Sequence, residues 1–187
     1  MLTTLFSTDD TKKNEDFSEK TIAELVRACF EMGKVKTGAL IVIERGTPLG
    51  EIERTGIEVD GIVTSQLLIN IFEHNTPLHD GAVVIRGNRV TAATCYLPLS
   101  DNMDISKALG TRHRAAVGVS EATDSVTLVV SEETGRVSVA VSGRLKSVKD
   151  GDELRDMLSV LVKRETENTG RFRIWKGRRR NERKADE

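Results

Sequence analysis

Apolar residues recur at helical spacing in several stretches of the chain. The first stretch covers residues 18–34, where Ser18 is a suitable N-cap and Gly33 a suitable stop. The apolar positions on its inner face are Ile22, Leu25, Val26, Cys29 and Met32. The same spacing predicts further helices at residues 64–74, 109–121 and 152–166.

Short apolar runs rich in β-branched residues alternate with these helices. They predict strands at residues 38–44, 82–86, 90–96, 125–130 and 136–142. The segment Gly87-Asn88-Arg89 predicts a hairpin, and Glu133-Thr134-Gly135 predicts a second turn. Because helices and strands interleave, we expect an α/β fold, a single globular domain whose central mixed sheet is flanked by helices on both sides.

The two ends of the chain differ in composition from this interior. Residues 1–17 are polar and charged and predict a flexible N-terminal linker, whereas residues 18–168 hold all the predicted elements. Residues 169–187 form a basic C-terminal tail with interspersed apolar residues. Such a tail can bind a membrane surface, an acidic partner or nucleic acid, but a solvated tail is the favoured interpretation.

Charge and cysteine content narrow the class of protein. The 28 basic residues nearly balance the 29 acidic ones, which argues against a uniformly basic surface, and we expect no nucleic-acid partner. Cys29 and Cys95 lie in apolar surroundings, so we expect buried thiols in a reducing compartment. No run of about 18 apolar residues occurs, so we expect no membrane span in this chain.

Polar groups gather where the predicted strand 82–86 begins. There His79 stands beside Asp80, and Gly81 and Ala82 follow directly. Polar groups at the edge of a core strand are costly unless they have a function. Asp80 can accept or orient a hydroxyl proton, and Gly81 allows a ligand to approach the backbone closely. Taken alone, Asp-Gly favours the simpler interpretation of a strand-entry turn.

A second polar cluster, Thr111-Arg112-His113-Arg114, begins the predicted helix 109–121. Guanidinium groups bind phosphate oxygens bidentately, so we expect Arg112 and Arg114 to contact phosphate. If the segment is extended, both arginines point to one side; if it opens the helix, its backbone N–H groups also favour phosphate. A solvated basic turn is the alternative.

A third cluster, Ser131-Glu132-Glu133, ends the predicted strand 125–130. Carboxylates beside phosphates require a divalent cation between them, and His79 is a candidate ligand, although a structural histidine is equally common. Tyr96 and Leu97 can hold an adenine base, or Tyr96 can be a core aromatic residue.

In this order and spacing, Asp80-Gly81-Ala82, Arg112-His113-Arg114 and Ser131-Glu132-Glu133 resemble the signature of the bacterial diadenylate cyclase domain. The resemblance covers roughly residues 21–162 and is greatest to the membrane-type cyclases of Gram-positive bacteria. It implies condensation of two ATP molecules into the second messenger cyclic di-AMP, with release of two pyrophosphates. It also implies a cytoplasmic catalytic domain whose parent protein is anchored in the bacterial cell membrane, with a naturally soluble relative as the alternative.

The resemblance implies roles for the motif residues. The catalytic set is Asp80, Gly81, Arg112, His113 and Arg114. The ATP-binding set is Gly81, Ala82, Tyr96, Leu97, Thr111, Arg112, His113, Arg114, Ser131 and Glu132. A divalent metal, Mn²⁺ or Mg²⁺ with Co²⁺ as a further option, would be held by His79 and Glu133, with Glu132 open as the alternative carboxylate.

Each ATP must act as both nucleophile and electrophile, so we expect a two-fold symmetric homodimer that brings two ATP molecules face to face. A regulatory protein partner could block that encounter. Two other functions fit parts of the pattern. A regulatory nucleotide-binding module would have lost part of the motif set, yet the set is intact. A metal-dependent phosphohydrolase would release phosphate or AMP and would need a second carboxylate and histidine set.

Overall fold

The computed structural model describes residues 17–102 and 109–161. Most of the predicted linker and the whole basic tail lie outside the described residues. The helices are α1 (Glu19–Lys34), α2 (Gly50–Glu53), α3 (Ser65–Phe72) and α4 (Thr111–Ala122), followed by a helix at residues 151–161. The strands are β1 (Ala39–Ile43), β2 (Ile57–Ile62), β3 (Ala82–Arg86), β4 (Arg89–Cys95), β5 (Val126–Val130), β6 (Val137–Val141) and β7 (Arg144–Ser147).

The described strands form one seven-stranded sheet in the order β2-β4-β3-β1-β5-β6-β7. β1 pairs with β3 in parallel, and every other pairing among the described strands is antiparallel. The central strands β1, β3 and β5 are buried along nearly their whole length, which is why they read as continuous apolar runs. The expected mixed sheet is confirmed.

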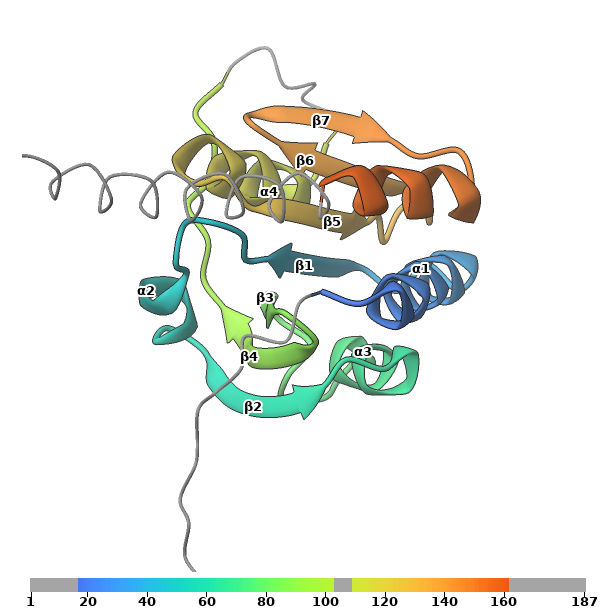
Figure 1. The fold of residues 1–187 in the computed structure, drawn as a ribbon, viewed down its shortest axis with the longest axis horizontal. Coiled ribbons are helices and arrows are strands. Elements are labelled where there is room, and N and C mark those ends of the chain that lie inside the picture. The colour runs from blue at the N-terminus through green and yellow to red at the C-terminus, as the bar shows by residue number, and fades with distance from the viewer. Residues whose placement is uncertain (1–16, 103–108, 162–187) are drawn as a thin grey trace, which may run out of the picture.

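Helices cover both faces of this sheet (Figure 1). Alternate residues of β1 point to opposite faces, so Ile41 packs in one apolar cluster and Leu40 in the other. The first cluster contains apolar residues of α1, α3 and the 151–161 helix, and α4 contributes to the second. The expected arrangement of a sheet between two helical layers is therefore confirmed.

The starts of α1 and α3 follow the sequence signals. Ser18 caps α1 by accepting a hydrogen bond from the Thr21 amide at 3.1 Å, and Thr64 does the same for α3. The expected stop at Gly33 is wrong by one residue, since α1 continues to Lys34. Gly33 is instead a point of close approach, because a Cβ there would lie 2.5 Å from the Gly135 carbonyl oxygen.

The sequence pattern missed α2, β2 and β7. β2 and β7 are the two edge strands of the sheet, and both are largely exposed. An exposed edge strand has no buried face to impose an apolar alternation, so neither segment carried the usual signal. α2 has four residues and no buried side chain, which leaves it without a helical stripe.

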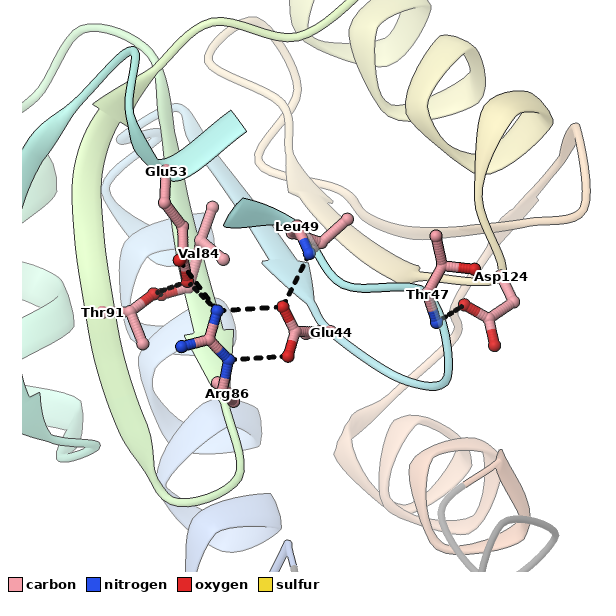
Figure 2. A network of polar contacts seen from close by, with 8 residues as sticks. All are labelled: Glu44, Thr47, Leu49, Glu53, Val84, Arg86, Thr91 and Asp124. Atoms are coloured by element: carbon pink, nitrogen blue, oxygen red, sulfur yellow. Dashed lines mark hydrogen bonds and ion pairs between the residues drawn. The ribbon is translucent and has the colours of Figure 1, made fainter. Parts of the chain in front are cut away.

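A polar network connects α2 to the sheet at the carboxyl ends of β1 and β3 (Figure 2). Arg86 on β3 donates to Glu44 at 2.6 Å and to Glu53 of α2 at 2.8 Å. Glu44 also accepts from the Leu49 amide, and Glu53 accepts from Thr91 of β4. The two carboxylate side chains are 11% and 18% exposed, so Arg86 balances charges that water reaches poorly.

Replacing Arg86 with Met should lower the free energy of unfolding by about 2–3 kcal/mol, because two largely desolvated carboxylates lose their shared cation. Urea unfolding measures the change. The matched control is Arg54→Met, which breaks an ion pair with Glu51 whose side chains are exposed, and should cost under about 0.5 kcal/mol. Equal losses in the two variants would contradict this role for Arg86.

Candidate active site

Strand direction brings the sequence motifs to one end of the sheet. β1 and β3 are parallel and begin at the same end, where Ala39 pairs with Val130 at the end of β5. Ala82 at the start of β3 pairs with Cys95 at the end of β4. Residues just before β3 and just after β4 and β5 therefore meet.

A cavity of about 860 Å³ lies at this end of the molecule, within the size range of small-molecule sites. Most of the predicted site residues line it: Asp80, Gly81, Tyr96, Leu97, Thr111, Arg112, His113, Ser131, Glu132 and Glu133. These side chains come from four separate stretches of the chain, which the fold gathers around one space.

Three predicted site residues lie elsewhere. Ala82 is fully buried in the apolar cluster beneath α4. Arg114 is absent from the cavity lining among the described residues, and its guanidinium donates to the Ser100 carbonyl. His79 lines a neighbouring hollow of about 510 Å³ together with Glu132 and Arg112, while Glu133 lines the main cavity.

The N-terminus of α4 opens onto the cavity. Thr111 is its first residue, so the helix-opening alternative for this segment is correct and the extended one is wrong. Gly110, Thr111, Arg112 and His113 all line the cavity. The first amide groups of a helix and its dipole both favour an anion at this point.

Arg112 forms an ion pair with Glu132, and both residues line the cavity. Nη1 of Arg112 lies 2.7 Å from Oε2 of Glu132. Gly38 leaves room for this pair, because a Cβ there would lie 3.0 Å from the Arg112 guanidinium and 3.1 Å from the Glu132 Cβ. The pair holds the Arg112 guanidinium, a group whose donors suit phosphate oxygens, beside the space that a ligand would enter.

His113 is buried against the cavity wall. Burial lowers its pKa below the ordinary value; nearby Glu133 opposes that shift, and Arg112 reinforces it. The imidazole is therefore neutral near pH 7, and it can offer one donor and one acceptor to a ligand.

The backbone conformation at position 81 requires glycine, independently of any ligand that approaches it. The φ of Gly81 is +110°, and a Cβ there would lie 2.7 Å from the backbone carbon of Thr94. Only glycine adopts this conformation readily. The residue therefore fixes how Asp80 emerges at the cavity rim.

One wall of the cavity is apolar. Tyr96 is 76% exposed and Leu99 is 52% exposed, and both line the cavity with Leu97. The interpretation of Tyr96 as a core aromatic residue is wrong. The same cavity is also lined by polar side chains, and Thr111, Arg112 and Ser131 form what we call its polar wall. One wall thus suits a planar base and the other suits phosphates.

Several cavity residues escaped sequence reasoning: Leu40, Arg136, Ser138, Leu145 and Ser147. Leu145 and Ser147 lie on β7, which the pattern did not predict. Arg136 directly follows the Glu133-Thr134-Gly135 turn, and its charge beside the third motif was the available signal.

The metal donors do not form a preassembled cage. In the described part of the chain no group of three or more histidine, cysteine or acidic side chains could hold an ion. His79 has Nδ1 2.6 Å from the Thr76 carbonyl oxygen, which leaves Nε2 for a ligand. One imidazole and one or two carboxylates fit a cation that takes its remaining ligands from phosphate oxygens and water.

Both cysteines are buried free thiols, as expected. Burial raises the pKa of Cys29 to about 12 and that of Cys95 to about 11, so neither is poised as a nucleophile near pH 7. Across residues 17–102 and 109–161, no helix has the length and apolar character to cross a membrane.

This fold and cavity define a nucleotide-binding α/β domain, and comparison with known proteins identifies its family. Residues 26–145 match the DAC family model, described as DisA bacterial checkpoint controller nucleotide-binding. The chain belongs to this family.

The relatives extend the match over most of the chain. It is 51% identical to cyclic di-AMP synthase CdaA of Bacillus subtilis over 166 residues, which cover 88% of this chain and 61% of that protein. A crystal structure of a DacA double mutant from Staphylococcus aureus matches with a TM-score of 0.75 and 46% identity, covering 77% of this chain and 96% of that one. A hypothetical membrane spanning protein from Bacillus cereus matches with a TM-score of 0.68 and 42% identity, covering 70% and 64%. The chain thus spans about three fifths of the length of the Bacillus subtilis relative.

The lowered pKa of His113 predicts a pH dependence of stability. Histidine in an unfolded chain titrates at about pH 6.5. At that pH the unfolded chain therefore binds a proton on His113 that the folded protein does not bind. Above that pH, neutral His113 makes its full contribution to the free energy of unfolding. The contribution is lost as the pH falls toward the lower pKa of His113 in the folded protein. Urea unfolding between about pH 7.5 and 5.5 should show this loss, and His113→Gln should reduce it. The exposed His74 provides a control, His74→Gln; an unchanged slope in His113→Gln would refute the assignment.

Proposed function

We propose that this domain is a diadenylate cyclase, a nucleotidyltransferase that condenses two ATP molecules into cyclic di-AMP and releases two pyrophosphates. The observation that carries the proposal is the cavity that places Asp80 with the N-terminus of α4, Arg112 and Ser131 around one space. The names of the relatives in this family support the same activity.

Each half-reaction forms a bond between the 3′-oxygen of one ATP and the α-phosphorus of another. The bond from that phosphorus to pyrophosphate breaks, and the 3′-hydroxyl proton leaves toward Asp80. A carboxylate suffices as the proton acceptor because such transition states are loose and the proton is lost late. The catalytic contribution of the site is mainly positioning and charge neutralisation.

The polar wall is assigned to the triphosphate. Thr111 and Ser131 offer hydroxyl donors, Arg112 offers a fork of donors, and the amides at the start of α4 add further hydrogen bonds. His113 stays neutral and orients a phosphate oxygen through one ring nitrogen. The apolar wall formed by Tyr96, Leu97 and Leu99 is assigned to adenine.

A divalent cation, Mn²⁺ or Mg²⁺ with Co²⁺ as a further option, would neutralise the phosphates and the departing pyrophosphate. His79 and a carboxylate of Glu132 or Glu133 would hold it. Glu132 shares a hollow with His79, which favours it over the expected Glu133. An imidazole ligand favours Mn²⁺ over Mg²⁺.

One cavity holds one ATP, so the reaction needs a second copy of the chain facing the first. Asp80 is exposed, and Tyr96 and Leu99 lie exposed at the same cavity, as a face-to-face homodimer requires. A regulatory protein that covers this face would block the encounter.

We place the catalytic domain at residues 18–168, between a linker at 1–17 and a basic tail at 169–187. The parent protein is proposed to be membrane-anchored, as the name of the Bacillus cereus structure suggests for that relative.

Asp80→Asn should bind ATP with nearly unchanged affinity but lose product formation by at least about a hundredfold, because the amide cannot take the 3′-hydroxyl proton. Calorimetric ATP binding and chromatographic product analysis give the two values. Turnover close to that of the unmodified protein would remove Asp80 from the mechanism.

Arg112→Met should weaken binding of both ATP and inorganic tripolyphosphate by about tenfold or more, because a charge-assisted contact to phosphate is lost. Titration of each ligand at fixed Mg²⁺ measures the change. Unchanged tripolyphosphate affinity would show that Arg112 does not contact phosphate.

A further inference from the structure

We propose that Arg114 is a positioning residue: it fastens the segment 96–102 onto α4 and thereby holds the apolar wall of the cavity in place. This inference rests on the proposed function, because the wall matters as the seat of a nucleotide base. It gives Arg114 an indirect role in base binding, through the segment 96–102, in contrast to the expected phosphate contact.

Helix geometry separates the two arginines of the motif. Residues two apart on an α-helix point in directions that differ by about 200°. Arg112 extends over the cavity to Glu132, so Arg114 projects from the other side of α4. In this structure the Arg112 guanidinium therefore lies at the cavity, whereas the Arg114 guanidinium is engaged by Ser100 outside the cavity lining.

Arg114 and Ser100 hold each other through both side chain and backbone. Arg114 Nη2 donates to the Ser100 carbonyl oxygen at 2.9 Å, and the Ser100 amide donates to the Arg114 carbonyl oxygen at 3.1 Å. Ser100 is 1% exposed, and its hydroxyl lies 2.9 Å from a carboxylate oxygen of Glu121, about two turns further along α4. Ser100 is thus anchored at three of its polar atoms.

Gly118 allows the segment to lie directly on α4. A Cβ at Gly118 would lie 2.8 Å from the Ser100 nitrogen and 2.9 Å from the Leu99 carbonyl carbon, and closer still to the Pro98 carbonyl oxygen. All of these are backbone atoms, so an added methyl group would have to displace the segment. Gly118 and Arg114 therefore act on the same stretch of chain by independent means.

The other end of the segment is fixed by Thr55, which lies just after α2. The amide of Tyr96 donates to the Thr55 hydroxyl at 2.9 Å. Tyr96, Leu97 and Leu99 line the cavity between this anchor and Ser100. Loss of the Ser100 anchor would free one end of the apolar wall and leave Thr111, Arg112 and Ser131 in place.

The test distinguishes a loss of base binding from a loss of phosphate binding. Calorimetry at fixed Mg²⁺ compares ATP with inorganic tripolyphosphate for Arg114→Met, Gly118→Ala and the unmodified protein. ATP affinity should fall about tenfold in both variants, the scale of one lost base–aromatic contact, while tripolyphosphate affinity should stay within about twofold. Arg89→Met, which removes an ion pair with Asp60 at the sheet edge, is the matched control and should change neither affinity.

A spectroscopic readout follows the segment itself. Tyr96 is the single tyrosine of the chain, so 3-fluorotyrosine labelling gives one ¹⁹F signal from the apolar wall. That signal should shift or broaden in Arg114→Met and in Gly118→Ala, but not in Arg89→Met. Should Arg114→Met fail to fold, Gly118→Ala still decides the point through the same two measurements.

The outcomes are distinct. If Arg114→Met lowers the affinity for tripolyphosphate as much as Arg112→Met does, Arg114 contacts phosphate and the proposal is overturned. An unchanged ¹⁹F signal in either folded variant would overturn it as well. Failure of the unmodified protein to bind ATP would count against the proposed function, and the ¹⁹F comparison would still decide whether Arg114 holds the segment.

Discussion

The parallel pairing of β1 with β3 is the constraint on which the site depends. In a described sheet that is otherwise antiparallel, this pairing makes two central strands begin at one end. Their antiparallel neighbours β4 and β5 then finish at that end, so Asp80, Tyr96 and Ser131 meet although Asp80 and Ser131 are 51 positions apart in the sequence. The buried apolar runs that form these strands therefore also determine the geometry of the cavity.

The direction of α4 adds the second constraint. Its first turn faces the cavity and supplies amides and Arg112 to one wall, while its far side carries Arg114 and Gly118 beneath the segment that forms the other wall. A single helix thus supports both the polar and the apolar wall of the cavity. The polar wall depends on charge and backbone donors, whereas the apolar wall depends on how tightly its segment is held.

The sequence alone predicted the elements and residues that are determined by neighbouring positions in the chain. The buried strands, the cap Ser18 and the polar motif residues of the cavity followed from apolar runs and motifs. The edge strands β2 and β7 escaped because exposed strands carry no apolar alternation. Gly38 and the direction of Arg114 escaped because each depends on a contact with a residue distant in sequence or on the rotation of a helix.

The most direct test of the central claim is the product balance when the purified chain is incubated with ATP and Mn²⁺. Chromatography with mass analysis, together with a pyrophosphate assay, counts each product against the ATP consumed. The cyclase predicts one cyclic di-AMP for every two ATP molecules and one pyrophosphate for each ATP. Inorganic phosphate or AMP in place of the cyclic dinucleotide would contradict the account and favour a hydrolase.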